Sequence, residues 1–238
     1  MAKVDMSARQ ENRRLMMQNA PISRVIPKMA VPTIVAFLIT SIYSLADTYF
    51  VSSLGTNATA AVSVNASLDQ LIMMCGSMLA MGANSYIARL LGQGEDEKAS
   101  RVLSTAFFLA LFLSLTLTVF GSIFITPMVN LLGATDTCRK YAIDYATFVL
   151  FAAPFMATSF VMNQCLRSEG SATLSMIGMG FGGILNCVLD PIFIFGSEGL
   201  AAKYGITLPF YMPGMGVAGA SLATAISKVI SFAILIFP

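Results

Sequence analysis

The chain has 238 residues, of which 56% are hydrophobic and only 11% are charged, and its formal net charge is +2. Soluble domains usually carry about 25% charged residues, and a core of this size cannot bury so many apolar side chains. An ordinary water-soluble domain is therefore excluded, and lipid is expected to surround much of the chain.

Six apolar segments follow one another along the chain. The first starts near Met29, lasts about 25 residues and lacks a small-residue cleavage site, so it is expected to be a retained helix rather than a signal peptide. Gly and polar clusters such as "GQGEDEKAS" separate the segments. We predict an all-α, polytopic membrane protein with a tail over 1–28 and one bundle over 29–238, whose helices cover about 29–53, 60–88, 102–127, 140–165, 172–196 and 215–238.

Lysine and arginine residues are unevenly distributed between the two ends of these helices. Ten lie in the tail, after the second helix or after the fourth, whereas three lie at the opposite ends, namely Arg139, Lys140 and Lys203. This asymmetry predicts a cytoplasmic N-terminus. It also accounts for the basic tail without a nucleic-acid partner.

Two aspartates interrupt the apolar segments. Asp47 lies in "SLADTYFVSSLG" and Asp190 in "ILNCVLDPIFIFG". A carboxylate in hydrocarbon costs at least about 2.5–3.5 kcal/mol, so such residues are functional candidates by default. Each aspartate lies eighteen positions from the predicted start of its helix, which places both at similar depth in the outer part of the membrane. A helix cap or an interfacial position is the alternative for one lone acid; two acids at one depth favour a shared site.

Further oxygen atoms are expected beside the two acids. Asn186 precedes Asp190 by one helical turn on the same face, and Thr224 lies at comparable depth in the last helix. Two carboxylates, an amide and a hydroxyl suit Na⁺ or a shared proton. With no histidine in the chain, carboxylates have to carry any proton. We therefore predict a cation-coupling site whose Na⁺ ligands, if sodium is the coupling ion, are Asp47, Asn186, Asp190 and Thr224.

Other membrane residues are secondary candidates. Asp69 and Tyr43 are expected to contribute to the same pocket or to lie at an interface. Pro32 and Pro191 are expected to bend their helices, because proline removes a backbone hydrogen bond. Lys228 lies in the middle of the last helix, where a lysine has to find a partner or reach the interface.

Enzymatic and metal-binding classes are disfavoured. The four cysteines are widely spaced without histidine partners, and neither HExxH nor GxSxG occurs. An intramembrane aspartyl protease is conceivable from two acids at one depth. We expect a protein that is not an enzyme and has no cofactor.

Five stretches of the sequence resemble the MATE (multidrug and toxic compound extrusion) family, and in particular its bacterial branch with DinF-like transporters. They are spread over residues 21 to 231 and read "PISRVIPKMAVPTIV", "SLADTYFVSSLG", "MGANSYIARLLGQG", "ILNCVLDPIFIFG" and "GVAGASLATAIS". Members of the family have twelve helices in two six-helix lobes, so the chain resembles the N-terminal lobe only. Because it ends inside apolar sequence, at "AILIFP", we expect a half or a fragment.

The resemblance also implies roles for particular residues. The family's N-lobe acids of helices 1 and 5 fall on Asp47 and Asp190, the asparagine one turn earlier on Asn186, the helix 6 threonine on Thr224, and the bending proline of helix 1 on Pro32. These motifs around both acids argue against a protease.

The function that the resemblance implies is export of drugs or organic cations across the bacterial inner membrane, driven by inward Na⁺ or H⁺. A central cleft would then require the missing C-terminal lobe or a second copy of the chain. One alternative is a lipid-linked precursor flippase of the same superfamily, which would need a basic cavity where the predicted spans offer only Lys228. Another is a non-transporting fragment or assembly module, which would tolerate loss of both acids.

Overall fold

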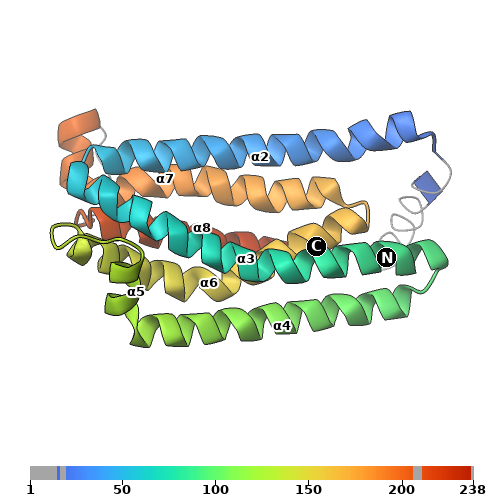
Figure 1. Ribbon diagram of the computed structural model, residues 1–238. Helices are drawn as coiled ribbons and strands as arrows, with labels where there is room; N and C mark the ends of the chain where they lie inside the picture. Colours follow the sequence, from blue (N-terminus) through green and yellow to red (C-terminus); the bar gives the residue numbers. More distant parts are fainter. Residues whose placement is uncertain (1–14, 17–19, 206–210, 237–238) are drawn as a thin grey trace.

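The computed structural model describes residues 15–16, 20–205 and 211–236, and within these it is helical without a strand (Figure 1). The six long helices are each long and apolar enough to cross a membrane, which confirms the predicted all-α, six-helix architecture. They are α2 (Ile22–Ser52), α3 (Thr56–Gln93), α4 (Asp96–Ile123), α6 (Arg139–Ser168), α7 (Ala172–Tyr204) and α8 (Val217–Ile236), and the short α5 (Ile125–Leu131) joins α4 to α6.

Several helices extend beyond the apolar segments that predict them. The helix α2 begins at Ile22, inside the predicted tail, and α3 continues to Gln93. An apolar segment indicates only the part of a helix that lies in hydrocarbon. The helical backbone can continue beyond that part into polar sequence, as far as a residue that terminates the helix. Gly94 ends α3 in the left-handed conformation, with φ 83°. Residues 1–14 and 17–19 of the predicted tail and the side chain of Lys203 lie outside the described part of the chain.

The helix α6 lies at the centre of the bundle, in contact with α3, α4, α7 and α8 (Figure 1). Its interior face is rich in alanine, which allows the neighbouring backbones to approach closely. Pro154 lies inside α6 and cannot donate a hydrogen bond to the Leu150 carbonyl. The Thr118 hydroxyl of α4 donates to that carbonyl instead, at 2.8 Å. The proline is thus accommodated by a neighbouring helix, as membrane helices require.

The helix α2 lies at the edge of the bundle along α7 (Figure 1). Only Ala36 and Val51 of α2 are buried, so most of this helix faces the surroundings of the lobe. Glycines of α7 make room for it: a Cβ added at Gly183 would lie 2.8 Å from the Tyr43 ring. The helix α2 is therefore the long helix with the least interior surface.

The backbone of α7 departs from helical geometry at Gly196, with φ 68° and ψ −176°. This region of backbone conformation is accessible essentially to glycine alone. A Cβ at this position would also lie 2.4 Å from the Met212 carbonyl oxygen. The Ser197 N–H donates to that same carbonyl at 2.9 Å, and the Met215 N–H donates to the Phe193 carbonyl at 2.9 Å. These two hydrogen bonds hold the segment before α8 against the corner at Gly196.

The two prolines that were expected to bend helices lie within helical backbone. Pro32 lies inside the continuous helix α2, and Pro191 lies five residues before the corner at Gly196. The bending role of both prolines stays a prediction.

Candidate functional site

Three of the predicted site residues form a hydrogen-bonded group between α7 and α8. The Asn186 amide donates to Asp190 Oδ1 at 3.0 Å and to Thr224 Oγ1 at 3.2 Å. Asp190 is 0% exposed and Asn186 is 2% exposed. Since Asn186 and Asp190 are separated by one helical turn, a single amide can orient a carboxylate on its own helix and a hydroxyl on the next.

Three buried oxygen atoms in this region have no hydrogen-bond donor in the described part of the chain. They are Asp47 Oδ1, Asn186 Oδ1 and Asp190 Oδ2. The charge of Asp47, which α2 contributes, acts on Asp190. A buried acceptor without a donor is costly, and a buried carboxylate without a partner is more so. The group therefore has the composition of a site for a small cation or a proton.

Asp69 of α3 is a third acid in the interior of the lobe. Its Oδ1 is buried without a hydrogen-bond partner in the described chain, and the charges of Lys228 and Asp47 act on it. Tyr145 of α6 is also buried there, within electrostatic range of Asp47, Asp69 and Asp190. Together with α8, which contributes Thr224 and Lys228, five helices place polar side chains in this interior.

Asn65 was not among the predicted site residues. Its amide donates to the Ala61 carbonyl at 2.9 Å and to the Ala142 carbonyl of α6 at 3.0 Å, and its Oδ1 has no donor in the described chain. The spacing of Asn65 and Asp69 repeats that of Asn186 and Asp190, and this repeat is the sequence signal that identifies Asn65.

Lys228 and Arg167 are partly buried basic side chains that lie against aromatic rings of α2. Lys228 donates a hydrogen bond to the Tyr43 hydroxyl at 3.0 Å, and its Nζ lies 5.2 Å from the centroid of that ring. The fourth helix was predicted to end near residue 165, but α6 continues to Ser168 and includes Arg167 in its last turn. The Arg167 guanidinium lies 5.3 Å from the Phe37 ring centroid and donates to Ser175 Oγ at 3.2 Å. Both cations thus lie over aromatic rings of α2.

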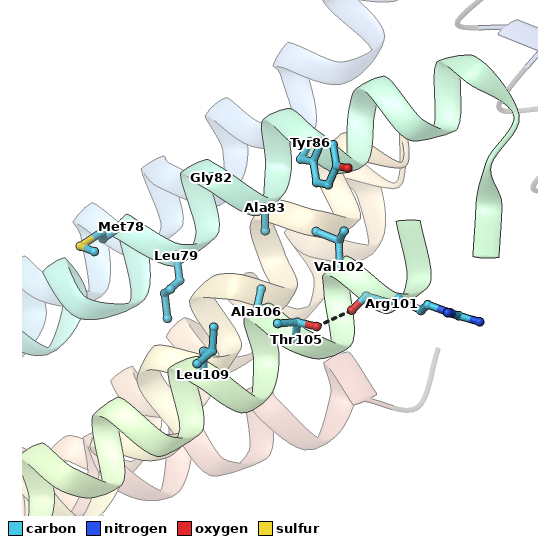
Figure 2. A pocket seen from close by; sticks show the side chains of 10 residues that line it. All are labelled: Met78, Leu79, Gly82, Ala83, Tyr86, Arg101, Val102, Thr105, Ala106 and Leu109. Carbon is cyan, nitrogen blue, oxygen red and sulfur yellow. Dashed lines mark hydrogen bonds between the residues drawn. The ribbon is translucent and has the colours of Figure 1, made fainter. Parts of the chain in front are cut away.

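A hollow of about 390 Å³ lies elsewhere, between α3 and α4 (Figure 2). Its walls are mainly apolar, with Met78, Leu79 and Leu109 among them, and Tyr86 and Arg101 lie at one end. Met78 is 78% exposed, so the hollow opens on the outer surface of the lobe. None of its lining residues is a carboxylate, and it contributes no ligand for a cation.

No group of three or more His, Cys, Asp or Glu side chains suited to a metal ion occurs among the described residues. Two carboxylates supplemented by an amide and a hydroxyl suit a monovalent cation or protons instead.

The described residues thus form a lobe of six membrane-length helices with acids buried between them. Two solved transporter structures contain this fold. A MOP superfamily transporter from Pyrococcus furiosus superposes with TM-score 0.81 at 30% sequence identity, and the match covers 94% of this chain and 46% of that one. A MATE family multidrug resistance transporter in an outward-facing conformation superposes with TM-score 0.78 at 31% identity, and the match covers 90% of this chain and 44% of that one.

Sequence comparison identifies the family. Residues 32–192 match the MatE family, and the chain therefore belongs to it, as the motifs predicted. The FAD transporter of Shewanella oneidensis is 33% identical over 91% of this chain and 45% of its own length. The multidrug export protein MepA of Staphylococcus saprophyticus is 31% identical over 85% of this chain and 42% of its own length. The chain spans less than half the length of these relatives.

Proposed function

We propose that the chain forms the N-terminal lobe of a cation-coupled antiporter that exports drugs or organic cations, with Na⁺ or H⁺ as the coupling ion. The observation that carries this proposal is the set of three buried oxygen atoms without donors, on Asp47, Asn186 and Asp190. The relatives named as multidrug export proteins support the same substrate class.

In the proposed cycle, the cation neutralises Asp47 and Asp190 and holds α2 against α7. When the cation leaves, two carboxylates in a low-dielectric interior repel each other, and α2, which has little buried surface, is the helix that shifts. Export is coupled to the ion because the two arrangements bind the cation with different affinity. Bends at Pro32 and Pro191 would accommodate the shift.

A second lobe has to complete the transport pathway. The chain covers 42% to 46% of the relatives and structures described above, so we propose that a C-terminal lobe or a second copy supplies the other wall of the substrate cleft. In the proposed orientation the N-terminus lies in the cytoplasm of a bacterium and the acids lie toward the outside of its inner membrane.

A second candidate function is export of a flavin nucleotide. The 33% identity to the FAD transporter favours it. It uses the same coupling site and differs in the substrate that the completed cleft accepts. The flippase alternative is less well supported, because Lys228 and Arg167, which are partly buried, already lie against Tyr43 and Phe37.

The test of the proposed function is transport by the complete transporter in liposomes. An imposed inward Na⁺ gradient or pH gradient should drive export of ethidium or, for the second candidate, of FAD. The export should stop when an ionophore collapses the gradient. Export of neither compound under either gradient would overturn the proposal.

A further inference from the structure

The Lys228–Tyr43 pair lies one helical turn from the oxygen group on each of three helices. On α2, Tyr43 precedes Asp47 by four residues, and on α8, Lys228 follows Thr224 by four. On α7, the Tyr43 ring packs against Gly183, three residues before Asn186. Because α2 and α7 run in the opposite direction to α8, all three offsets point toward the Ile22 end of the bundle.

The ammonium of Lys228 is incompletely compensated. It has three N–H donors, and the Tyr43 hydroxyl is its one hydrogen-bond acceptor among the described residues. No carboxylate oxygen of the described chain lies within 4 Å of it. By contrast, Arg167 donates to three partners: Ser175, Gln164 and Met179. The structure of the lobe thus holds a positive charge next to a group of unpartnered oxygen atoms without joining the two in an ion pair.

We infer that Lys228, held in place by Tyr43, is a built-in cation that weakens binding of the coupling ion and closes the site toward the Ile22 end of the bundle. This inference rests on the proposed function and adds a determinant of ion affinity. Asp69 of α3 is the acid on which the charge of Lys228 acts, and the charge of Asp47 acts on both Asp69 and Asp190. Asp47 lies one helical turn along α2 from Tyr43, the partner of Lys228. These acids attract a mobile cation, and Lys228 repels it.

The arrangement has two consequences for transport. An ion bound between Asp47 and Asp190 has to pass a fixed positive charge to continue toward the Ile22 end, which opposes leakage of the ion through the lobe. The bound ion is also released more readily, because the repulsion persists after it binds. Unit charges about a helical turn apart, at an effective dielectric constant of about 20, change an ion affinity by roughly tenfold or more.

The experiment measures cation-dependent thermal stability of the purified chain in lipid nanodiscs. NaCl is titrated against choline chloride at constant ionic strength, and pH is titrated separately. The variants are K228M, which removes the charge; K228R, which keeps it; Y43F, which removes the acceptor; and K98M, which changes a lysine paired with Glu95 in an exposed position. The half-saturating concentration of Na⁺ or protons is the readout, and it is independent of any uniform change in melting temperature.

The inference predicts that K228M lowers the half-saturating cation concentration by roughly tenfold or more. K228R and K98M should leave it unchanged, and Y43F should lower it less than K228M does.

An unchanged half-saturating concentration in K228M, with a responsive wild type, would overturn the role of Lys228 and leave the proposed function standing. In that case the lysine serves only to link α8 to α2. If neither the wild type nor K228M responds to either cation, both the inference and the proposed function fail.

Discussion

Replacing Asp190 by asparagine is expected to abolish cation-driven efflux by the complete transporter. Asp190 is fully buried, and its Oδ2 has no hydrogen-bond donor in the described chain. Asparagine has nearly the same shape but can neither bind a proton nor neutralise a cation. The lobe should therefore still insert and fold, while dye export under a Na⁺ or pH gradient falls to the level of liposomes without protein. Asp47→Asn should have the same effect, since Asp47 supplies the second charge.

The matched control for both variants is Asp136→Asn. Asp136 is 87% exposed and pairs with Arg139 at the surface, at 2.6 Å. The same chemical change there should leave efflux within experimental error of the wild type, because exposed ion pairs contribute little. Full gradient-driven efflux by both Asp47→Asn and Asp190→Asn would show that the acids do not couple transport to the ion.

Gly219→Ala is expected to destabilise the lobe by about 3 kcal/mol or more. A Cβ at Gly219 would lie 2.3 Å from the Phe193 carbonyl oxygen and 2.5 Å from its carbonyl carbon. These atoms belong to the backbone of α7, so they cannot move aside as a flexible side chain can. The two helices have to separate, and the 3.2 Å hydrogen bond from Asn186 to Thr224 spans the same pair of helices.

Gly82→Ala is the matched control for Gly219→Ala, and we expect it not to destabilise the lobe. Gly82 also lies inside a long helix, α3, but a Cβ there would meet no atom within 4 Å. Alanine favours helix by roughly 0.8–1.0 kcal/mol over glycine in a water-exposed helix, so this variant should be neutral or slightly more stable. The stability of both variants, Gly219→Ala and Gly82→Ala, is measured by thermal unfolding in detergent. Equal melting temperatures for the two variants would contradict the close approach of α7 and α8.

The helices and part of the site were predictable because they depend on local spacing. Apolar segments of membrane length identify the six helices, and a four-residue spacing places Asn186 and Asp190 on one face of a helix. The hydrogen bond from Asn186 to Thr224 depends in addition on the depth of both helices, which hydropathy gives approximately.

Contacts between distant segments were not predictable in the same way. The Lys228–Tyr43 hydrogen bond joins residues 185 positions apart, and no local pattern indicates which ring a buried lysine reaches. The corner at Gly196 depends on the backbone of residues 212–214, which packs against it from the segment before α8. The sequence predicts a bend at Pro191, because proline breaks helices more strongly than glycine does. The departure from helical backbone occurs instead at Gly196.

The central claim is that the oxygen group of Asp47, Asn186 and Asp190 binds a monovalent cation or a proton. The most direct measurement is the melting temperature of the purified chain as Na⁺ is titrated at constant ionic strength and as pH is lowered. A bound ion stabilises the folded lobe by about 2.7 kcal/mol at a hundred times its dissociation constant. We predict a saturable rise in melting temperature with one of the two cations, and no such rise in Asp190→Asn. Melting temperatures that respond identically in the wild type and Asp190→Asn, or in neither, would contradict the claim.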